Sequence, residues 1–424
     1  MPRRTIPSLK NKGQSVAFKF VHTADIHLDS PLKSLAMREQ GLADLVGNAT
    51  RQVLRRIVDL CLSEQVQALV IAGDLYDGAQ TSMKTARFLA QEMRRLDEAG
   101  VEVYLIRGNH DAMSKITTEL ELPSSVKVFG GRAEVVSTNW NGHPVAVHGI
   151  SFRQPHAPDS LLPKFKAPVA GAFNLGILHT SLGGAAGHDL YAPCTLPDLQ
   201  AMGFDYWALG HIHVRKVYEG QTTVVMPGIP QGRDIGEAGQ KSVTLVSVAD
   251  NGEMTLSERC LGAAQFERVD LPCDGIELWS DLLDALQRTI RQARRDFEAE
   301  HLILRIDVRG ASSLYWRARR DQDLLFAEAQ VVAEQLGTVW IDKIELGLKV
   351  PEATPPVGAV GELLELLEQE GPSDGRADYA ALRRHLPTAL RGMFGDDEAQ
   401  EASGLTKLAQ QGAQDILSRL ETDS

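Results

Sequence analysis

Residues 103–111 read Val-Tyr-Leu-Ile-Arg-Gly-Asn-His-Asp, so a short apolar run ends directly in polar side chains. The apolar part is typical of a buried strand. The tetrapeptide Gly-Asn-His-Asp would arise by accident in a chain of this length only roughly a few times per thousand. In α/β domains, ligands bind beyond the carboxyl ends of the strands. The stretch therefore predicts an α/β domain with a site at a strand end.

Four other predicted strands end in the same way, in residues that can ligate a metal. They are residues 18–23, followed by Asp25 and His27; residues 68–72, followed by Asp74; residues 175–178, followed by His179; and residues 206–209, followed by His211 and His213. These ligands span almost 190 residues of sequence. Because strand ends converge on one crevice, all five segments are expected to lie together. Any single Asp-x-His or Gly-Asp pair is common by chance, so the prediction depends on the whole series.

Each ligand type fits such a site. Asp25 and His27 are two residues apart, so beside a strand they point to the same side and can bind one ion. The same holds for His211 and His213, although in a loop the two imidazoles can also diverge toward two ions. The Asp74 carboxylate, alone after its strand, can bridge two cations. Gly73, Gly108 and Gly210 precede ligands, where the chain is expected to turn sharply.

Asn109 adds a neutral carbonyl oxygen, and the set contains no thiolate. Imidazole, carboxylate and amide together favour Mn²⁺, Fe²⁺ or Zn²⁺ over Ca²⁺ or Mg²⁺. The cysteines, Cys61, Cys194, Cys260 and Cys273, show no CxxC spacing. Neither a disulfide framework nor a zinc-thiolate site is therefore expected.

Seven ligands are too many for one catalytic ion with an open position. They suit two ions that share Asp74 at a separation of about 3.5–4 Å, with an activated hydroxide attacking phosphorus in line. His110 follows Asn109, so its side chain is expected to point toward substrate, where it would stabilise the transition state or protonate the leaving oxygen. On its own, His179 would be a core or surface histidine. Asp111 is as suited to a structural role, orienting a neighbouring ring or capping a helix, as to a part in the chemistry.

Length and composition predict two or three domains in the 424 residues. Residues 1–17 are basic with no apolar stretch behind them, which predicts a mobile segment rather than a signal peptide. Residues 18–262 alternate apolar strands with helices, as α/β domains do. Residues 263–350 predict a small α+β domain. Residues 351–424 open with a proline-rich linker and continue in amphipathic helices, which are expected to dock onto another surface.

The remaining predicted elements follow from apolar periodicity. In the α/β domain they are strands at residues 101–106, 145–148 and 223–226 and helices at 48–64 and 81–99, the second of them ended by Gly100. In the α+β domain they are strands at 267–271, 302–309 and 339–348 and helices at 278–299 and 323–336. In the C-terminal tail they are helices at 361–369 and 405–420.

The net charge of −12, taken whole, disfavours a nucleic-acid partner. Residues 351–424 hold 14 acidic and 6 basic residues, however, so the first 350 residues carry only −4. Arginine clusters at 51–56, 288–295 and 317–320 permit a polyanion without demanding one. No apolar run reaches the length of a membrane span, and a cytoplasmic location is expected.

The series DxH, GD, GNHD, H and GHxH across residues 18–250 resembles that of the calcineurin-like metallophosphoesterases. Within that superfamily the chain most resembles the SbcD-type DNA repair nucleases, and especially the bacterial YhaO-like exonucleases. The closer resemblance rests on further stretches: His179-Thr-Ser181, Gly187-His188-Asp189-Leu-Tyr-Ala-Pro193, Tyr206-Trp207-Ala208 and Pro227-Gly-Ile-Pro-Gln-Gly-Arg233.

The resemblance implies a four-layer α/β/β/α sandwich with a small α+β capping domain and a helical C-terminal tail. It implies one metal held by Asp25, His27, Asp74 and His213, a second held by Asp74, Asn109, His179 and His211, and a catalytic His110. Similar proteins use manganese, form dimers and degrade DNA from its ends together with an SbcC-like coiled-coil ATPase. Two Mn²⁺ ions, a homodimer and such an ATPase, docked on the C-terminal helices, are expected here.

Two positions depart from the family pattern. Asp77 stands where some relatives carry a histidine, three residues after the bridging aspartate, and others an acid. Asp234 stands where similar proteins commonly have histidine, and would add negative charge beside a DNA phosphate. His188, Gln231 and Arg233 are predicted phosphate contacts, with a structural loop role as the alternative for each.

The leading prediction is a metal-dependent DNA nuclease, a 3′-to-5′ exonuclease of DNA repair with single-strand endonuclease action as an addition. A phosphatase or phosphodiesterase for nucleotides or small phosphoesters is the alternative on the same metal site. An enclosed pocket would favour that alternative, and an open, arginine-lined groove the nuclease. A non-catalytic, metal-binding regulatory subunit of a coiled-coil ATPase is a second alternative. Such proteins lose ligands, and this chain keeps all seven.

Overall fold

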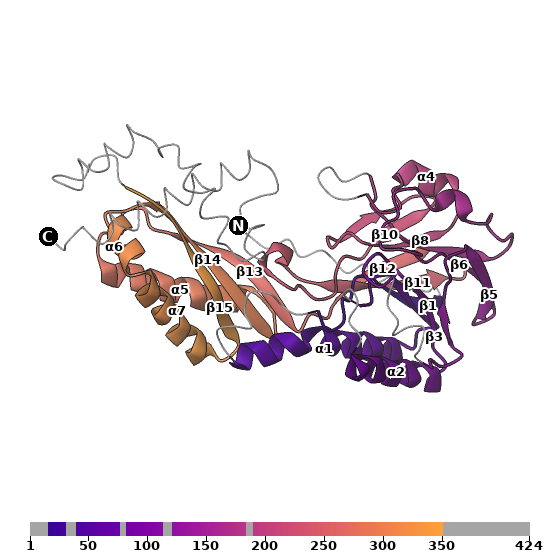
Figure 1. Cartoon of the computed structure of the whole chain (residues 1–424), viewed down its shortest axis with the longest axis horizontal. Coiled ribbons are helices and arrows are strands. Elements are labelled where there is room, and N and C mark those ends of the chain that lie inside the picture. The colour runs from indigo at the N-terminus through magenta and orange to yellow at the C-terminus, as the bar shows by residue number, and fades with distance from the viewer. Residues whose placement is uncertain (1–15, 31–39, 77–81, 113–120, 184–189, 351–424) are drawn as a thin grey trace, which may run out of the picture. The chain divides into compact units, whose positions relative to one another are not determined.

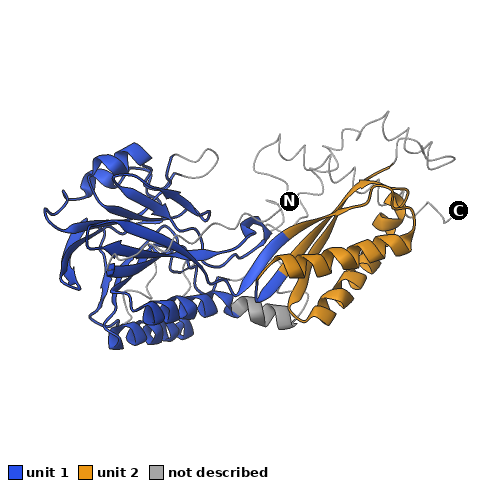
Figure 2. Cartoon of the chain, turned by 180° about the vertical axis from the view of Figure 1, so that it is seen from behind, with its two compact units in different colours: residues 1–267, 299–302 blue, residues 268–298, 303–424 orange. Residues whose placement is uncertain are grey.

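The computed structural model describes residues 16–30, 40–76, 82–112, 121–183 and 190–350, of which residues 40–47 by backbone alone (Figure 1). The chain divides into two compact units, residues 1–267 with 299–302 and residues 268–298 with 303–424 (Figure 2). No helix within the described ranges is long and apolar enough to cross a membrane.

The described part of the first unit contains two six-stranded sheets. The first has the order β12-β11-β1-β2-β3-β4, with β1 Val16–Thr23, β2 Ala68–Ala72, β3 Glu102–Ile106, β4 Val126–Val128, β11 Ser242–Ala249 and β12 Met254–Cys260. The second has the order β5-β6-β7-β8-β10-β9, with β5 Glu134–Trp140, β6 His143–Gly149, β7 Phe173–His179, β8 Tyr206–Gly210, β9 Lys216–Tyr218 and β10 Thr223–Met226. In the first sheet β1, β2 and β3 pair in parallel, and in the second β6, β7 and β8 do.

The side chains of each strand alternate between two faces, one packed against the other sheet and one packed against helices. The unit therefore has four layers, with helices outside each of the two sheets. In β2, Leu69 and Ile71 pack toward helices α1 (Gln40–Glu64) and α2 (Met83–Glu98), whereas Val70 packs between the two sheets. In β8, Tyr206 packs between the sheets, and Trp207 packs toward α4 (Leu196–Ala201) on the outer face. Figure 1 shows α1 and α2 on one side of the sheets and α4 on the other. The predicted α/β/β/α sandwich is confirmed.

Most predicted elements of this unit are present with shifted ends. The strand at 68–72 is reproduced at both ends, and α1 begins at Gln40, eight residues before its predicted start. Gly100 ends α2 as predicted: its φ is 72°, and its N–H donates to the Asp97 carbonyl at 2.9 Å. Strands β4, β5, β9, β11 and β12 were not predicted.

The second unit contains the order strand, helix, strand, helix, strand that the sequence predicts. Its sheet has the order β13-β14-β15, with β13 Ala264–Pro272, β14 His301–Ala311 and β15 Val339–Lys349. Its helices are α5 Trp279–Asp296, α6 Tyr315–Arg320, which was not predicted, and α7 Gln322–Leu336. The helices predicted at 361–369 and 405–420 lie outside the described residues.

Candidate metal centre

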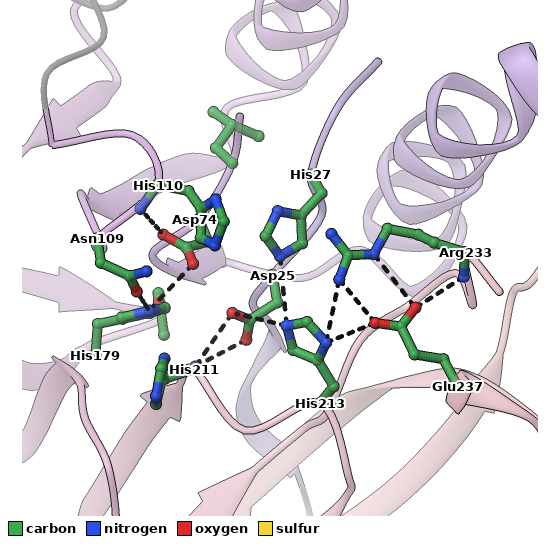
Figure 3. Close-up of polar contacts among 12 residues, drawn as sticks. Asp25, His27, Asp74, Asn109, His110, His179, His211, His213, Arg233 and Glu237 are labelled. Carbon is green, nitrogen blue, oxygen red and sulfur yellow. Dashed lines mark hydrogen bonds and ion pairs between the residues drawn. The ribbon is translucent and has the colours of Figure 1, made fainter. Parts of the chain in front are cut away.

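The predicted ligands meet at the carboxyl ends of five strands (Figure 3). Asp25 and His27 follow β1, Asp74 follows β2, Asn109 follows β3, His179 ends β7, and His211 and His213 follow β8. Backbone bonds join the loops: the Asp25 N–H donates to the Gly73 carbonyl and the His27 N–H to that of Asp74, each at 3.0 Å. The strand ends that the sequence marks therefore form one cluster.

Asp25, His27 and His213 form the first group in this cluster, with their ligand atoms all within 4.8 Å of one another. Nε2 of His27 lies 3.4 Å from Nε2 of His213. Two nitrogens bound to one cation at about 2.1 Å and a tetrahedral angle stand about 3.4 Å apart. The spacing of the two imidazoles therefore fits a single ion between them.

Asp25, Asp74 and His179 form the second group, again within 4.8 Å. Nε2 of His179 lies 3.3 Å from Oδ2 of Asp74 and 3.0 Å from Oδ1 of Asn109. The ring of His211 lies 5.2 Å from that of His179, centroid to centroid. Asp25 is the residue that both groups share, so two adjoining positions are available for cations. The predicted bridging role of Asp74 stays a prediction.

Several of these side chains stand on backbone that non-glycine residues rarely adopt. The φ angles are 52° for Asp25, 46° for His27, 50° for Asp74 and 100° for His211. Left-handed backbone of this kind is sterically unfavourable outside glycine and concentrates at functional sites. The fold thus holds these ligands in place against local strain.

Three glycines surround the buried ring of His179. A Cβ on Gly108 would stand 2.7 Å from its Nε2, one on Gly73 2.5 Å from Nδ1, and one on Gly210 2.9 Å from Nδ1. Real Cβ atoms do not approach so closely, so a side chain at any of the three would displace the imidazole. The prediction that these glycines serve a sharp turn needs correction, because only Gly73 has a positive φ, at 94°, while Gly108 and Gly210 provide space.

Two family models match the chain, one within the first unit and one mostly within the second. Residues 18–215 match the calcineurin-like phosphoesterases, and residues 266–349 match the middle domain of the metallophosphoesterase YhaO. Residues 18–215 are a calcineurin-like metallophosphoesterase domain. The family is one of phosphoester hydrolases that use divalent metals, and the Asp and His groups of this domain are positioned to bind them.

Curated proteins similar to this chain agree with the assignment of this domain. Over 393 residues it is 29% identical to the uncharacterized metallophosphoesterase YhaO of Bacillus subtilis (strain 168), covering 90% of this chain and 94% of that protein. It is 25% identical over 272 residues to the DNA double-strand break repair protein Mre11 of Methanocaldococcus jannaschii, covering 60% and 67%. It is 26% identical over 212 residues to Mre11 of Methanopyrus kandleri, covering 46% and 44%. The predicted resemblance to YhaO-like metallophosphoesterases is confirmed.

Burial and neighbouring charges shift the pKa values of Asp25 and His179 in this site. Burial, with the nearby Asp74 carboxylate as an added cause, raises the pKa of Asp25 to about 6. For His179 burial opposes the charged ring, but the carboxylate of Asp74 raises its pKa to about 10. Nδ1 of His179 lies 2.9 Å from the Ala72 carbonyl, which only accepts, so Nε2 is the atom turned toward Asp74. A cation bound at Nε2 would take the place of a proton.

Asp111 is a fully buried carboxylate that binds backbone rather than a ring or a helix end. Its Oδ1 accepts from the N–H of Gly108 at 2.6 Å and its Oδ2 from that of Leu75 at 2.9 Å. Burial and then the charge of Asp74 raise its pKa to about 7. Asp111 therefore joins the loops after β2 and β3 that carry Asp74 and Asn109.

His110 is exposed at the edge of the cluster and belongs to neither ligand group. Its backbone N–H donates to Oδ1 of Asp74 at 2.9 Å, and its ring lies 4.9 Å from that of His27, centroid to centroid. The side chain is thus held next to the ligands yet reaches solvent, from which a substrate would arrive. Its catalytic role stays a prediction.

The first predicted phosphate contact, Gln231, is a buried residue of a loop. Gln231 is 1% exposed; its amide donates to the carbonyls of Gly232 and Ala264 and accepts from the N–H groups of Ala263 and Ala264. All its hydrogen-bonding capacity is used by backbone, so its placement does not support the prediction of a phosphate contact. His188 and Asp77 lie outside the described residues.

Arg233 and Asp234 lie in the loop that follows Gln231. The guanidinium of Arg233 donates to Oε1 of Glu237 at 2.7 Å. Asp234 caps the short helix η2 (Ile235–Glu237), accepting from the N–H of Gly236 at 2.7 Å. The departure at Asp234 therefore has a structural explanation.

Glu237 was not predicted at all. Its Oε1 lies 2.7 Å from Nδ1 of His213 (Figure 3). Burial works against its charge, but the bonds from His213 and Arg233 hold the pKa of this carboxyl well below its usual range. A single glutamate in a loop carries no local pattern, so only the folded chain brings it to a ligand.

Proposed function

We propose that this metallophosphoesterase is a metal-dependent DNA nuclease, acting as a 3′-to-5′ exonuclease in DNA repair. The observation that carries the proposal is the pair of adjoining ligand groups that share Asp25, because two-metal phosphoester hydrolysis needs two such positions. DNA as the substrate is supported by the relatives named for double-strand break repair.

We assign seven side chains to the two ions. One ion would be held by Asp25, His27, Asp74 and His213, and the other by Asp74, Asn109, His179 and His211. When bound, two such cations lower the pKa of a water molecule and neutralise phosphoryl oxygens. The donor set favours Mn²⁺, Fe²⁺ or Zn²⁺, and among these Mn²⁺ is proposed on the resemblance.

His110 is assigned to the leaving group. Its imidazole is exposed, and the bond from its backbone to Asp74 keeps it beside the ligands. From there it can donate a proton to the leaving oxygen or stabilise the charge that develops on the phosphoryl group. Groups in this role contribute about 10²- to 10⁴-fold to the rate.

Partners are proposed on the resemblance alone. We propose a coiled-coil ATPase of the SbcC kind and a homodimer, with residues 351–424, outside the described part of the chain, as the docking segment. The cytoplasmic location stays a prediction.

The test uses one linear duplex labelled separately at its 5′ and 3′ ends, with Mn²⁺, Mg²⁺ or chelator. Digestion from the 3′ end turns the 5′ label into a ladder of shortening strands and releases the 3′ label at once as mononucleotide; the reverse pattern would refute the polarity. A generic phosphomonoester is assayed in parallel. The His110→Ala variant, which should retain its metal, excludes a contaminating nuclease. Turnover of the monoester alone would refute the DNA proposal in favour of a phosphatase. Bound metal with no turnover of either substrate would favour a regulatory subunit.

A further inference from the structure

Glu237 directs a carboxylate at one of the proposed ligands from outside every segment that the sequence singles out (Figure 3). An ionised carboxylate can only accept a hydrogen bond. Nδ1 of His213 lies 2.7 Å from Oε1 of Glu237 and 3.4 Å from Nη2 of Arg233, so the shorter contact with the carboxylate assigns a proton to Nδ1. In a neutral ring this leaves the lone pair on Nε2, the atom that faces His27 and Asp25.

We propose that Glu237 is a positioning residue of the metal centre, which fixes the Nδ1–H tautomer of His213 and turns its Nε2 toward the first ligand group. The inference rests on the proposed role of His213 as a metal ligand. Carboxylates that hold the second nitrogen of a ligating histidine set the ring orientation and raise its basicity.

Arg233 holds this carboxylate in turn. Its guanidinium donates to Oε1 of Glu237 at 2.7 Å, and its backbone N–H donates to Oε2 at 2.8 Å. Both oxygens of Glu237 are thereby engaged, and the side chain cannot rotate without breaking contacts to two residues. Arg233 thus helps to position His213 through Glu237, and this role does not depend on a contact between Arg233 and a phosphate.

The loop that presents Glu237 is itself fixed at both ends. Gln231 ties its start to the backbone of Ala263 and Ala264. Asp234 caps η2, and the Gly239 N–H donates to the Phe266 carbonyl at 2.9 Å. The approach of Glu237 to His213 is therefore a property of the folded loop and not of one long side chain.

Three variants separate orientation of His213 from integrity of the loop. Glu237→Ala removes the acceptor. Glu237→Gln keeps an acceptor oxygen without the charge. Asp234→Ala removes the cap of η2 but keeps both partners of the contact between Glu237 and His213 and the ties at Gln231 and Gly239, and so serves as the control for loop integrity.

The first readout is Mn²⁺ binding by equilibrium dialysis, without substrate. Glu237→Ala is expected to weaken one of the two ions about 10- to 100-fold and Glu237→Gln by less than about tenfold, as for other partners of ligating histidines. Asp234→Ala should bind both ions as the unaltered chain does. Equal losses in Asp234→Ala and Glu237→Ala would show that loop folding alone matters and would overturn the proposal, as would unchanged binding in Glu237→Ala.

The second readout is the tautomer of His213 in the metal-free protein, from long-range ¹H–¹⁵N spectra of chain labelled at histidine. A His213→Gln variant identifies the resonance. The Nδ1–H form is expected in the unaltered chain and a mixture of tautomers in Glu237→Ala, whereas an Nε2–H form in the unaltered chain would overturn the proposal. Neither readout involves DNA. A chain that passes both but cleaves no nucleic acid would refute the nuclease and leave the role of Glu237 standing.

Discussion

The ring of His179 occupies the space that a side chain on Gly108 would need, with its Nε2 2.7 Å from where a Cβ would stand. Neither partner can withdraw easily. His179 is fully buried, with its Nδ1 bonded to the Ala72 carbonyl, and the Gly108 N–H is bonded to Asp111. The identity of residue 108 and the position of a proposed ligand are therefore linked directly.

Gly108→Ala is expected to displace the carboxylate of Asp74 and the ring of His179. It should abolish tight metal binding by the group that contains both residues and lower the hydrolysis rate by about 100-fold or more, since small misplacements in an active site have that effect. Bound Mn²⁺ and turnover measure both consequences. The control is Gly220→Ala, where the nearest atom to an added Cβ is 3.8 Å away. Unchanged metal content in Gly108→Ala would contradict the close packing described here.

Asp111→Asn is expected to lose about 1–3 kcal/mol of unfolding free energy, because an amide leaves one buried backbone N–H without its acceptor. It should also weaken metal binding about 10- to 100-fold, because the loops carrying Asp74 and Asn109 come apart. Asp205→Asn is the matched control, since Asp205 accepts from the Asn174 N–H at the opposite ends of β7 and β8 from the ligands. Urea unfolding and dialysis should show a stability loss in both variants and a metal defect in Asp111→Asn alone.

Divalent cations are expected to stabilise the fold, because Asp25 and Asp74 bring two buried carboxylates into one ligand group. At 100 times its dissociation constant, a ligand adds about 2.7 kcal/mol per site. For a domain of about 150–250 residues that unfolds as one unit, this raises Tm by roughly 5–10 °C. Thermal melts in Mn²⁺ and in chelator measure the shift, and Asp25→Asn should reduce it. Identical melting in both conditions would argue against a metal centre.

Because of His22, we expect the free energy of unfolding to fall at acid pH. It is fully buried, with Nδ1 3.0 Å from the Tyr206 hydroxyl and Nε2 3.1 Å from the Leu209 carbonyl, and burial lowers its pKa to about 3. The unfolded ring titrates near its ordinary value of about 6.5. The stability contributed by the neutral ring is thus complete above pH 6.5 and is lost as the pH falls toward 3, by about 2 kcal/mol at pH 5.

Urea unfolding at pH 7 and pH 5, in chelator, tests this dependence. The His22→Gln variant should lose less stability than the unaltered chain over that interval, because its amide does not titrate. Parallel losses in the two proteins would assign the acid sensitivity to other groups.

The ligand cluster was predictable because each of its segments combines an apolar run with a polar residue at the end of a parallel strand. The run at residues 68–72 ends where β2 ends, and Asp74 follows it in the sequence and in the fold alike. Strands β11 and β12 extend the same sheet beyond β1 but contribute no ligand, and neither was predicted.

Contacts made by folded loops were not predictable. Glu237 is 24 residues from His213, and no spacing rule joins a loop glutamate to a distant imidazole. Gln231 was predicted as a phosphate contact, with a structural loop role as the alternative, and its contacts are those of a structural loop residue. The backbone that buries it, at Ala263 and Ala264, lies more than 30 residues further along the chain.

The backbone is left-handed at Asp25, His27, Asp74 and His211, so the residues that metal binding requires lower the stability of the fold. Conformations of this kind cost of order 1–3 kcal/mol each, and glycine or asparagine would adopt them more readily. Selection for heat resistance alone would therefore favour replacements at these four positions, each raising the stability of the fold and abolishing hydrolysis.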